Sequence, residues 1–315
     1  MRPILKRMCM GVLGALCAVA VFIPASGASA ATTTLAGDWA PFNRCPVTDP
    51  AMLAATGTTS IAFCVASDSP SGTIKIGNVT ATTGDTNLQI GVVEDASTGT
   101  FSVVAPSAGA VVEAPVQIPG GLLGLMCPSD IPAVTAVCDE ITDSALNAVT
   151  AVVESAGTPS NFSLAAGLSS GVPIVTVPVK IQLENPLLGS DCYLGSNSDP
   201  ILLQPENATT PTVQSEQFDA NGTPDATNGV MGAIFSTGGT QEDDTAAVPG
   251  ASGCGLLGIL DPAVDLKDGL PSASGNNSVV LNDASAYLAG VENPASVAPN
   301  DGQDLATYWQ SAVQS

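Results

Sequence analysis

Residues 175–184 constrain the fold most strongly, because apolar and polar side chains alternate along them without a break. The odd positions hold five aliphatic residues, which are Val175, Val177, Val179, Ile181 and Leu183. A period of two is typical of a β-strand with one face buried and the other in solvent. Pro178 cannot donate a backbone hydrogen bond, which predicts a sheet edge or a bulge at this point. We therefore expect a sheet with one buried face.

Shorter segments also have the composition of strands. They are rich in β-branched and apolar residues, turn sequences separate them, and they lie at 59–65, 72–77, 88–93 and 101–105. Short strands with spaced turns indicate an antiparallel sandwich or barrel. We expect a β-rich N-terminal lobe over 31–118 and a β-rich C-terminal lobe over 158–315. Within the second lobe, residues 205–250 are polar and are expected to form a long surface loop, in which only residues 230–235 resemble a strand.

Residues 119–157 are expected to form a helical segment between the lobes. Apolar residues recur there at steps of three or four, at Val134, Cys138, Ile141, Ala145, Val149 and Val152. This spacing places them on one face of a helix. Asp130 fits an N-cap, and Gly157 with Pro159 ends the pattern. The predicted fold is therefore mainly β, with antiparallel sandwich- or barrel-like lobes on either side of one long central helix.

Residues 1–30 have the pattern of a secretory signal peptide. Arg2, Lys6 and Arg7 precede an apolar run from Met8 to Ile23, and small residues follow at 28–30. The run is shorter than the roughly 20 residues that span a membrane as a helix. We expect cleavage after Ala30, a secreted, extracellular protein, and no transmembrane segment after cleavage. The mature chain would keep four basic residues against 29 acidic ones, a net charge of −25.

Six cysteines remain after the predicted cleavage: Cys45, Cys64, Cys127, Cys138, Cys192 and Cys254. An even number of cysteines in an exported chain predicts disulfide bonds. Six cysteines allow 15 pairings. We expect sequential pairing, Cys45–Cys64, Cys127–Cys138 and Cys192–Cys254, because it fits the segments described above. A metal site is the weaker alternative, because the chain has neither a C-x-x-C pair nor a histidine.

The composition argues against several functions. Without histidine, a triad or a metal site that uses histidine is impossible, and seven basic residues in 315 cannot form a patch for phosphates. Nucleic acid is therefore not an expected partner. Residues 167–171 match G-x-S-x-G, but strand-like residues follow them and the histidine partner is missing. We expect no catalytic residue, no cofactor and no metal.

Two stretches near the N-terminus resemble a known group of proteins. They are Phe-Asn-Arg-Cys-Pro-Val at 42–47, continued by Asp-Pro-Ala-Met-Leu at 49–53, and Ser-Pro-Ser-Gly-Thr-Ile-Lys-Ile-Gly at 69–77. With Cys64 between them, these stretches are similar to uncharacterised exported proteins of high-GC actinobacteria, most clearly over the first 90 residues. That group carries no established activity. The resemblance therefore implies export and gives no catalytic residue.

Three functions fit these observations. The first is an exported non-enzymatic structural or surface-interaction protein, with an unknown protein or a cell-wall component as partner. The second is an extracellular carrier of an apolar small molecule such as a lipid, sterol or terpenoid, which a mean hydropathy of +0.33 favours. Leu-Leu-Gly at 122–124, 187–189 and 256–258 either anchors loops or lines such a site. The third is a secreted hydrolase with two catalytic carboxylates. Only Trp39 and Trp309, with three tyrosines, remain in the mature chain to stack on sugars, which argues against it. A large apolar cavity would favour the carrier.

The mass of the secreted protein tests the predicted export and bridges. The chain should begin at Ala31 and should weigh two hydrogen atoms less for each of three disulfides than the reduced chain. Intact-mass spectrometry of unreduced protein, secreted by its own host, measures both quantities. A mass that includes residues 1–30 would show that cleavage does not occur there.

Overall fold

The computed structural model describes residues 34–127, 129, 131–141, 144–225, 227, 231–291 and 300–313. The fold described here belongs to the compact unit Thr33–Ser315. The predicted signal peptide and the predicted N-cap Asp130 lie outside the described residues. Within the described ranges, no helix is both long and apolar enough to cross a membrane.

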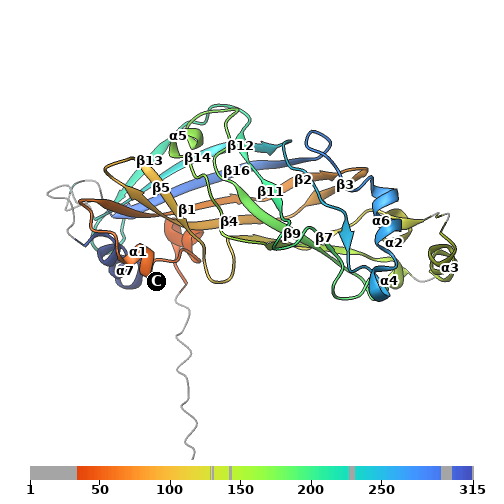
Figure 1. Ribbon diagram of the computed structural model, residues 1–315. Coiled ribbons are helices and arrows are strands. Elements are labelled where there is room, and N and C mark those ends of the chain that lie inside the picture. The colour runs from red at the N-terminus through yellow and green to blue at the C-terminus, as the bar shows by residue number, and fades with distance from the viewer. Residues whose placement is uncertain are drawn as a thin grey trace, which may run out of the picture. The chain divides into compact units, whose positions relative to one another are not determined.

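Ten strands form the larger sheet, and all their pairings are antiparallel (Figure 1). Its main path is β12–β14–β16–β1–β4–β5, and β13, β2, β3 and β6 pair beside this path. The strands are β1 (Ser60–Ser69), β2 (Ser71–Ile76), β3 (Val79–Thr83), β4 (Thr86–Asp95), β5 (Thr100–Val104), β6 (Val111–Glu113), β12 (Glu206–Asn207), β13 (Gln214–Phe218), β14 (Gly232–Asp243) and β16 (Ser278–Val291). The path does not return to its first strand, so this sheet is open.

Six shorter strands form the second sheet, in the order β15–β10–β9–β8–β7 with β11 also paired to β9. They are β7 (Val116–Gln117), β8 (Thr150–Ser155), β9 (Val177–Glu184), β10 (Tyr193–Leu194), β11 (Ile201–Leu203) and β15 (Ala251–Ser252). The alternating segment is confirmed as β9, but Pro178 does not lie at a sheet edge. Its carbonyl accepts a hydrogen bond from the Ala156 N–H at 2.9 Å, just past the end of β8. The missing N–H of Pro178 therefore falls where the pairing with β8 stops.

The mainly β, antiparallel fold is confirmed, but its division into two lobes is wrong. β14 and β16 belong to the predicted C-terminal lobe, yet they lie in the same sheet as β1 to β6. β16 pairs with β1 through its second half and with β2 through its first half. The strands of the two predicted lobes thus form one continuous sheet, because β16 pairs with both β1 and β2.

The long central helix is also corrected. Residues 132–140 form α3 (Pro132–Glu140), residues 144–147 form α4 (Ser144–Asn147), and the predicted last turns are strand β8. Val149 and Val152 match a helical spacing, but they belong to a run of β-branched residues that favours a strand. β8 pairs with β7 and β9 on its two sides. Strand pairing therefore overrides the helical spacing here.

The predicted polar loop over 205–250 is wrong for much of its length. It contains β12, β13 and β14, and β14 runs from Gly232 to Asp243. The second half of β14 is rich in Gly and acidic residues, which have low strand propensity. β14 forms a strand because it pairs with β16 along nearly its full length.

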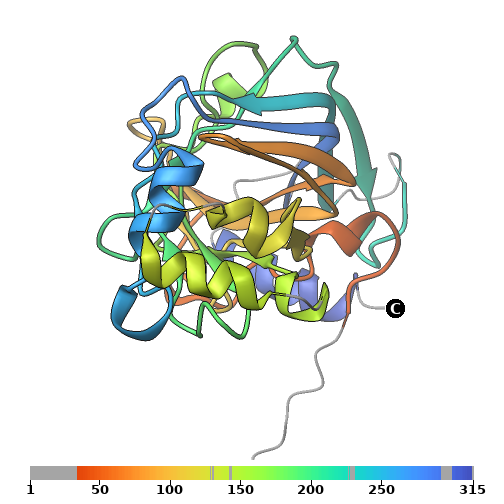
Figure 2. The same ribbon diagram turned by 90° about the vertical axis from the view of Figure 1, so that its right-hand side faces the viewer.

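The helices are short and gather at the two ends of the sheets (Figure 1, Figure 2). α2, α3, α4 and α6 lie at one end, and α1 and α7 pack together at the other. Those not yet given are η1 (Gly37–Phe42), α1 (Pro50–Leu53), α2 (Gly121–Met126), α5 (Leu164–Gly167), η2 (Leu256–Gly258), α6 (Asp261–Asp268) and α7 (Asp301–Ser311).

The larger sheet buries side chains on both faces. In β1, Phe63 packs into a core shared with the second sheet. Its neighbours Ala62 and Cys64 pack on the opposite face, against η1, α1 and α7. Successive side chains of a strand point to opposite faces, so one strand serves two cores.

Aromatic residues fill the core on the face of the larger sheet that η1, α1 and α7 cover, which we call the outer face. The Trp39 ring lies 4.8 Å from Phe218, 5.4 Å from Tyr308 and 5.1 Å from Trp309, between ring centroids. All three contacts are edge-to-face, a favoured geometry for aromatic pairs. This cluster joins η1, the end of β13 and α7, which are far apart in the sequence.

The three predicted disulfides are confirmed. Cys45 pairs with Cys64, Cys127 with Cys138, and Cys192 with Cys254. The first bond fixes the segment after η1 to β1, and the third joins the start of β10 to the turn before η2. A disulfide restricts the unfolded chain, and each typically contributes about 2–4 kcal/mol of stability.

The aromatic cluster should carry a large share of the stability. We expect Trp39→Ala to lower the free energy of unfolding by about 3–5 kcal/mol, because it leaves a cavity among rings with few ways to collapse. Urea unfolding measures the change. Leu257→Ala, at a side chain that is 97% exposed, should shift it by less than about 0.5 kcal/mol. Equal effects of the two substitutions would contradict the assignment of this core.

Candidate functional site

Three adjoining hollows lie along the larger sheet. The main hollow is about 400 Å³ and lies between this sheet and the segment around α5, while the middle hollow of about 90 Å³ and the far hollow of about 50 Å³ lie between the two sheets. The main and middle hollows share wall residues Ser67, Leu88, Pro205 and Gln241. The middle and far hollows share Ile74, Ile76, Glu113, Val153 and Ile181. The three therefore follow one another along the larger sheet.

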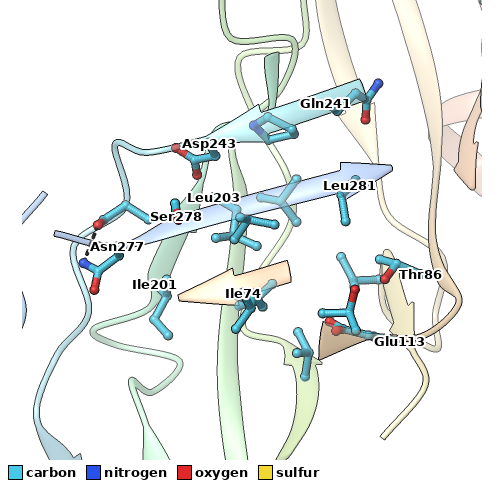
Figure 3. Close-up of a pocket in the computed structure, with 18 of the residues that line it drawn as sticks. Ile74, Thr86, Glu113, Ile201, Leu203, Gln241, Asp243, Asn277, Ser278 and Leu281 are labelled. Carbon is cyan, nitrogen blue, oxygen red and sulfur yellow. Dashed lines mark hydrogen bonds between the residues drawn. The ribbon is translucent and has the colours of Figure 1, made fainter. Parts of the chain in front are cut away.

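Strand periodicity explains why the walls are aliphatic. Val177, Val179 and Ile181 of β9 line the middle hollow, and they are the apolar positions of the alternation seen in the sequence. Opposite them lie Ile74 of β2 and Leu281 of β16, and Ile201 and Leu203 of β11 complete the apolar wall (Figure 3). β-Branched and short aliphatic side chains fill less space than aromatic rings. Their packing between two sheets leaves the hollows.

The main hollow has the most exposed apolar rim. Phe162, Ile90 and Leu288 are among its wall residues. Four further wall residues are large, apolar and exposed, with exposed fractions of 37% for Leu164, 45% for Leu168, 46% for Val213 and 45% for Phe235. Apolar side chains around a hollow of this size are typical of a binding site for an apolar ligand. We therefore take the main hollow as the entrance.

Glu113 is the most unusual polar residue on these walls. It lies in β6 directly opposite Thr86 of β4, and it lines both the middle and the far hollows (Figure 3). Its Oε1 has no hydrogen-bond partner. Burial raises the pKa of Glu113 to about 7, because the charged carboxylate loses its hydration in apolar surroundings. The Thr83 hydroxyl, on the same middle hollow, is also buried without a partner.

Asp268 lines the far hollow at the end of α6. Its side chain is buried, its Oδ1 has no hydrogen-bond partner, and burial raises its pKa to about 7. Asp243, which is equally buried, is different: its carboxylate accepts hydrogen bonds from the Gln204 N–H at 2.7 Å and from both the N–H and the hydroxyl of Thr245. The unpartnered state of Glu113 and Asp268 is thus not a general feature of the buried acids.

The Leu-Leu-Gly segments do not line the hollows. Leu122 and Leu188 are fully buried in the core, which agrees with loop anchoring. In the third copy, Leu256 and Leu257 are 83% and 97% exposed. None of these residues belongs to the walls of the three hollows, so the lining that we considered from the sequence is wrong.

The two tryptophans are also not available to stack on sugars. Trp39 and Trp309 are buried within the aromatic cluster and cannot stack on a ligand. Within the described ranges, His, Cys, Asp and Glu form no group able to hold a metal ion. The site residues that the sequence did not indicate are Glu113 and Asp268. Glu113 stands in the apolar segment 111–116, which was a weak signal, and Asp268 resembles an ordinary surface acid at the end of an amphipathic helix.

The raised pKa of Glu113 predicts a pH dependence of stability. The folded protein holds this proton up to about pH 7, while an unfolded glutamate releases it near its ordinary value of 4.5. The free energy of unfolding should therefore fall as pH rises from about 4.5 to about 7. Between pH 5 and pH 8 the wild type should lose about 2–3 kcal/mol more than Glu113→Gln, which keeps a neutral side chain.

Urea unfolding at the two pH values measures this difference. Glu184→Gln, at an exposed position at the end of β9, serves as the control and should behave like the wild type. If Glu113→Gln and the wild type lose the same free energy of unfolding between the two pH values, the Glu113 carboxyl is not buried and unpaired as described.

Comparison with known proteins gives no relative from which a function could be transferred. No protein-family model matches the chain, no curated protein matches it, and no solved structure matches it. What this protein binds therefore has to be argued from the walls of the hollows and the groups that they leave unpaired.

Proposed function

We propose that this protein is an extracellular carrier that binds an apolar small molecule in the hollows along its larger sheet. The observation that carries the proposal is the main hollow, about 400 Å³ of space with walls dominated by aliphatic and aromatic side chains. Sites for small molecules are mostly apolar and measure roughly 300–1,000 Å³. A protein interior normally leaves few voids larger than a water molecule. A hollow of this size is therefore better explained by a ligand than by imperfect packing.

The energetics favour an apolar ligand. Each methylene group transferred from water to such a wall contributes about 0.8 kcal/mol. A chain of about ten carbons would gain enough to offset the loss of translational and rotational freedom, which costs at least about 4 kcal/mol. Water gains little in the same space, because few wall groups can hydrogen-bond it.

The export that the sequence predicts also supports the carrier proposal. The predicted signal peptide and the disulfides fit a protein that works outside the cell, where an apolar molecule needs a soluble carrier. A mature net charge of −25 would keep such a carrier soluble. The hydrolase alternative loses support, because the tryptophans that it needs are buried.

The surface-interaction role stays a prediction. Four large side chains near η2 and α6 are exposed and apolar: Leu256, Leu257, Ile259 and Leu266. Such a group can contact another surface. The structure holds nothing that identifies the partner, so the carrier is the function that the geometry supports best.

Binding of Nile red, a neutral apolar dye, tests the proposal. We expect fluorescence enhancement with the wild type, and at least about tenfold weaker binding with Leu168→Glu, which places a carboxylate on the rim of the main hollow. Leu202→Glu is the matched control. Leu202 is as exposed as Leu168, at 46% against 45%, but it lies on the other face of its sheet and lines no hollow.

Fluorescence titration of the three proteins gives the dissociation constants. Weak binding by Leu168→Glu alone would support the hollow as the site. No binding by the wild type would overturn the proposal, and equal weakening by both variants would place the dye elsewhere on the surface.

A further inference from the structure

Unpaired polar atoms are concentrated on the walls of the hollows. Among the described residues, four buried side-chain polar atoms have no hydrogen-bond partner. Three of them lie on these walls: Thr83 Oγ1 and Glu113 Oε1 on the middle hollow and Asp268 Oδ1 on the far hollow. Leaving such a group unpaired costs stability, so each one calls for an explanation.

Thr83 and Glu113 are held close together by the chain around them. The Ala114 N–H, next to Glu113, donates to the Asp85 carbonyl at 2.9 Å, and Thr86 is the direct cross-strand partner of Glu113. Residues 83–86 and 113–114 therefore lie side by side. Both unpaired groups line the middle hollow, where Thr83 is only 6% exposed.

Gly72 allows β2 to lie close to β16 and to the Thr83 hydroxyl. A Cβ atom at this position would lie 2.7 Å from Thr83 Oγ1 and 2.4 Å from the Val280 carbonyl oxygen. Any larger residue would displace the hydroxyl or the backbone of β16. Glycine at position 72 therefore keeps the Thr83 hydroxyl in its place on the apolar wall.

We propose that the natural ligand carries a neutral hydroxyl group, which hydrogen-bonds to both Glu113 and Thr83 while its apolar body extends toward the main hollow. This inference rests on the proposed carrier function and narrows its ligand to an alcohol of an aliphatic chain, sterol or terpenoid. A hydroxyl has one donor and two acceptor sites. It can donate to the Glu113 carboxylate and accept from the Thr83 hydroxyl at the same time.

The charges around the middle hollow argue against a fatty acid. Lys75 is the single basic residue on the described walls of the hollows, and it is exposed at a position between the inward-facing Ile74 and Ile76. Asp243 already accepts three hydrogen bonds, and Glu242 is exposed. A ligand carboxylate would meet Glu113 without a cation to balance either charge, and like charges at short range repel. A plain hydrocarbon would leave both polar groups unpaired.

Three ligands of equal chain length separate these possibilities. Decane, 1-decanol and decanoate are each titrated against bound Nile red at pH 8, where the Glu113 carboxyl is mostly ionised. We expect 1-decanol to bind about tenfold more tightly than decane, the effect of one net hydrogen bond or slightly more, and decanoate to bind most weakly.

Variants test whether these two residues cause the preference. Thr83→Val and Glu113→Met keep the size of the side chain and remove the polar group, so they should reduce 1-decanol binding to the level of decane. Decane binding should stay within about twofold, which also shows that both variants fold. Glu113→Gln should strengthen decanoate binding by about tenfold, since it removes the repelling charge, while Glu184→Gln should change nothing.

The outcomes distinguish this inference from the proposed function. If decane and 1-decanol bind equally to the wild type, or if the variants keep the preference for 1-decanol, the hydroxyl ligand is wrong although the carrier function stands. If decanoate binds most tightly, the ligand is an acid and the inference is overturned. If neither Nile red nor any of the three ligands binds, the carrier function itself is wrong.

Discussion

The pairing of β16 holds the rest of the structure in place. This strand, from Ser278 to Val291, pairs with β14 along one side and with β1 and β2 along the other. Through these pairings, the segments that follow Cys45 and those that precede α7 enter one sheet. The two faces of this sheet are covered by different elements of the chain. η1, α1 and α7 close the outer face, while the second sheet covers the inner face across the hollows.

The contrast between the two faces has a physical origin. The outer core holds Trp39, Phe42, Tyr308 and Trp309, whose flat rings interlock edge to face and fill the volume. The inner faces present mainly Val, Ile and Leu, with a smaller group of rings formed by Phe63, Phe101 and Phe162. Interiors are otherwise packed as densely as organic crystals. The outer face is therefore filled by interlocking rings, while the inner faces leave the three hollows.

Much of the fold could be predicted from the sequence, but the candidate site could not. The disulfides follow from an even number of cysteines in sequential segments, and β9 follows from its alternation, because both signals are local. The helix predicted within 119–157 fails because Val149 and Val152 also belong to a run of β-branched residues, and pairing partners decide between helix and strand. The second half of β14 was missed because its polar residues become a strand only beside β16. Glu113 and Thr83 are separated by 30 positions in the sequence, and only the pairing of β4 with β6 brings their neighbourhoods together.

The unpaired groups show where stability has been given up for another purpose. Leucine or methionine at Glu113 would remove a buried charge, and valine at Thr83 would remove a buried hydroxyl, so both changes should stabilise the empty protein. The chain instead keeps both polar groups on an apolar wall, and Gly72 allows the Thr83 hydroxyl to sit close to β2. A ligand that supplies the missing hydrogen bonds would recover the lost stability on binding. The free energy of unfolding would then rise with ligand concentration, and it would rise most for ligands whose polar group fits both Glu113 and Thr83. The same defect that weakens the empty fold would thus give the site its selectivity.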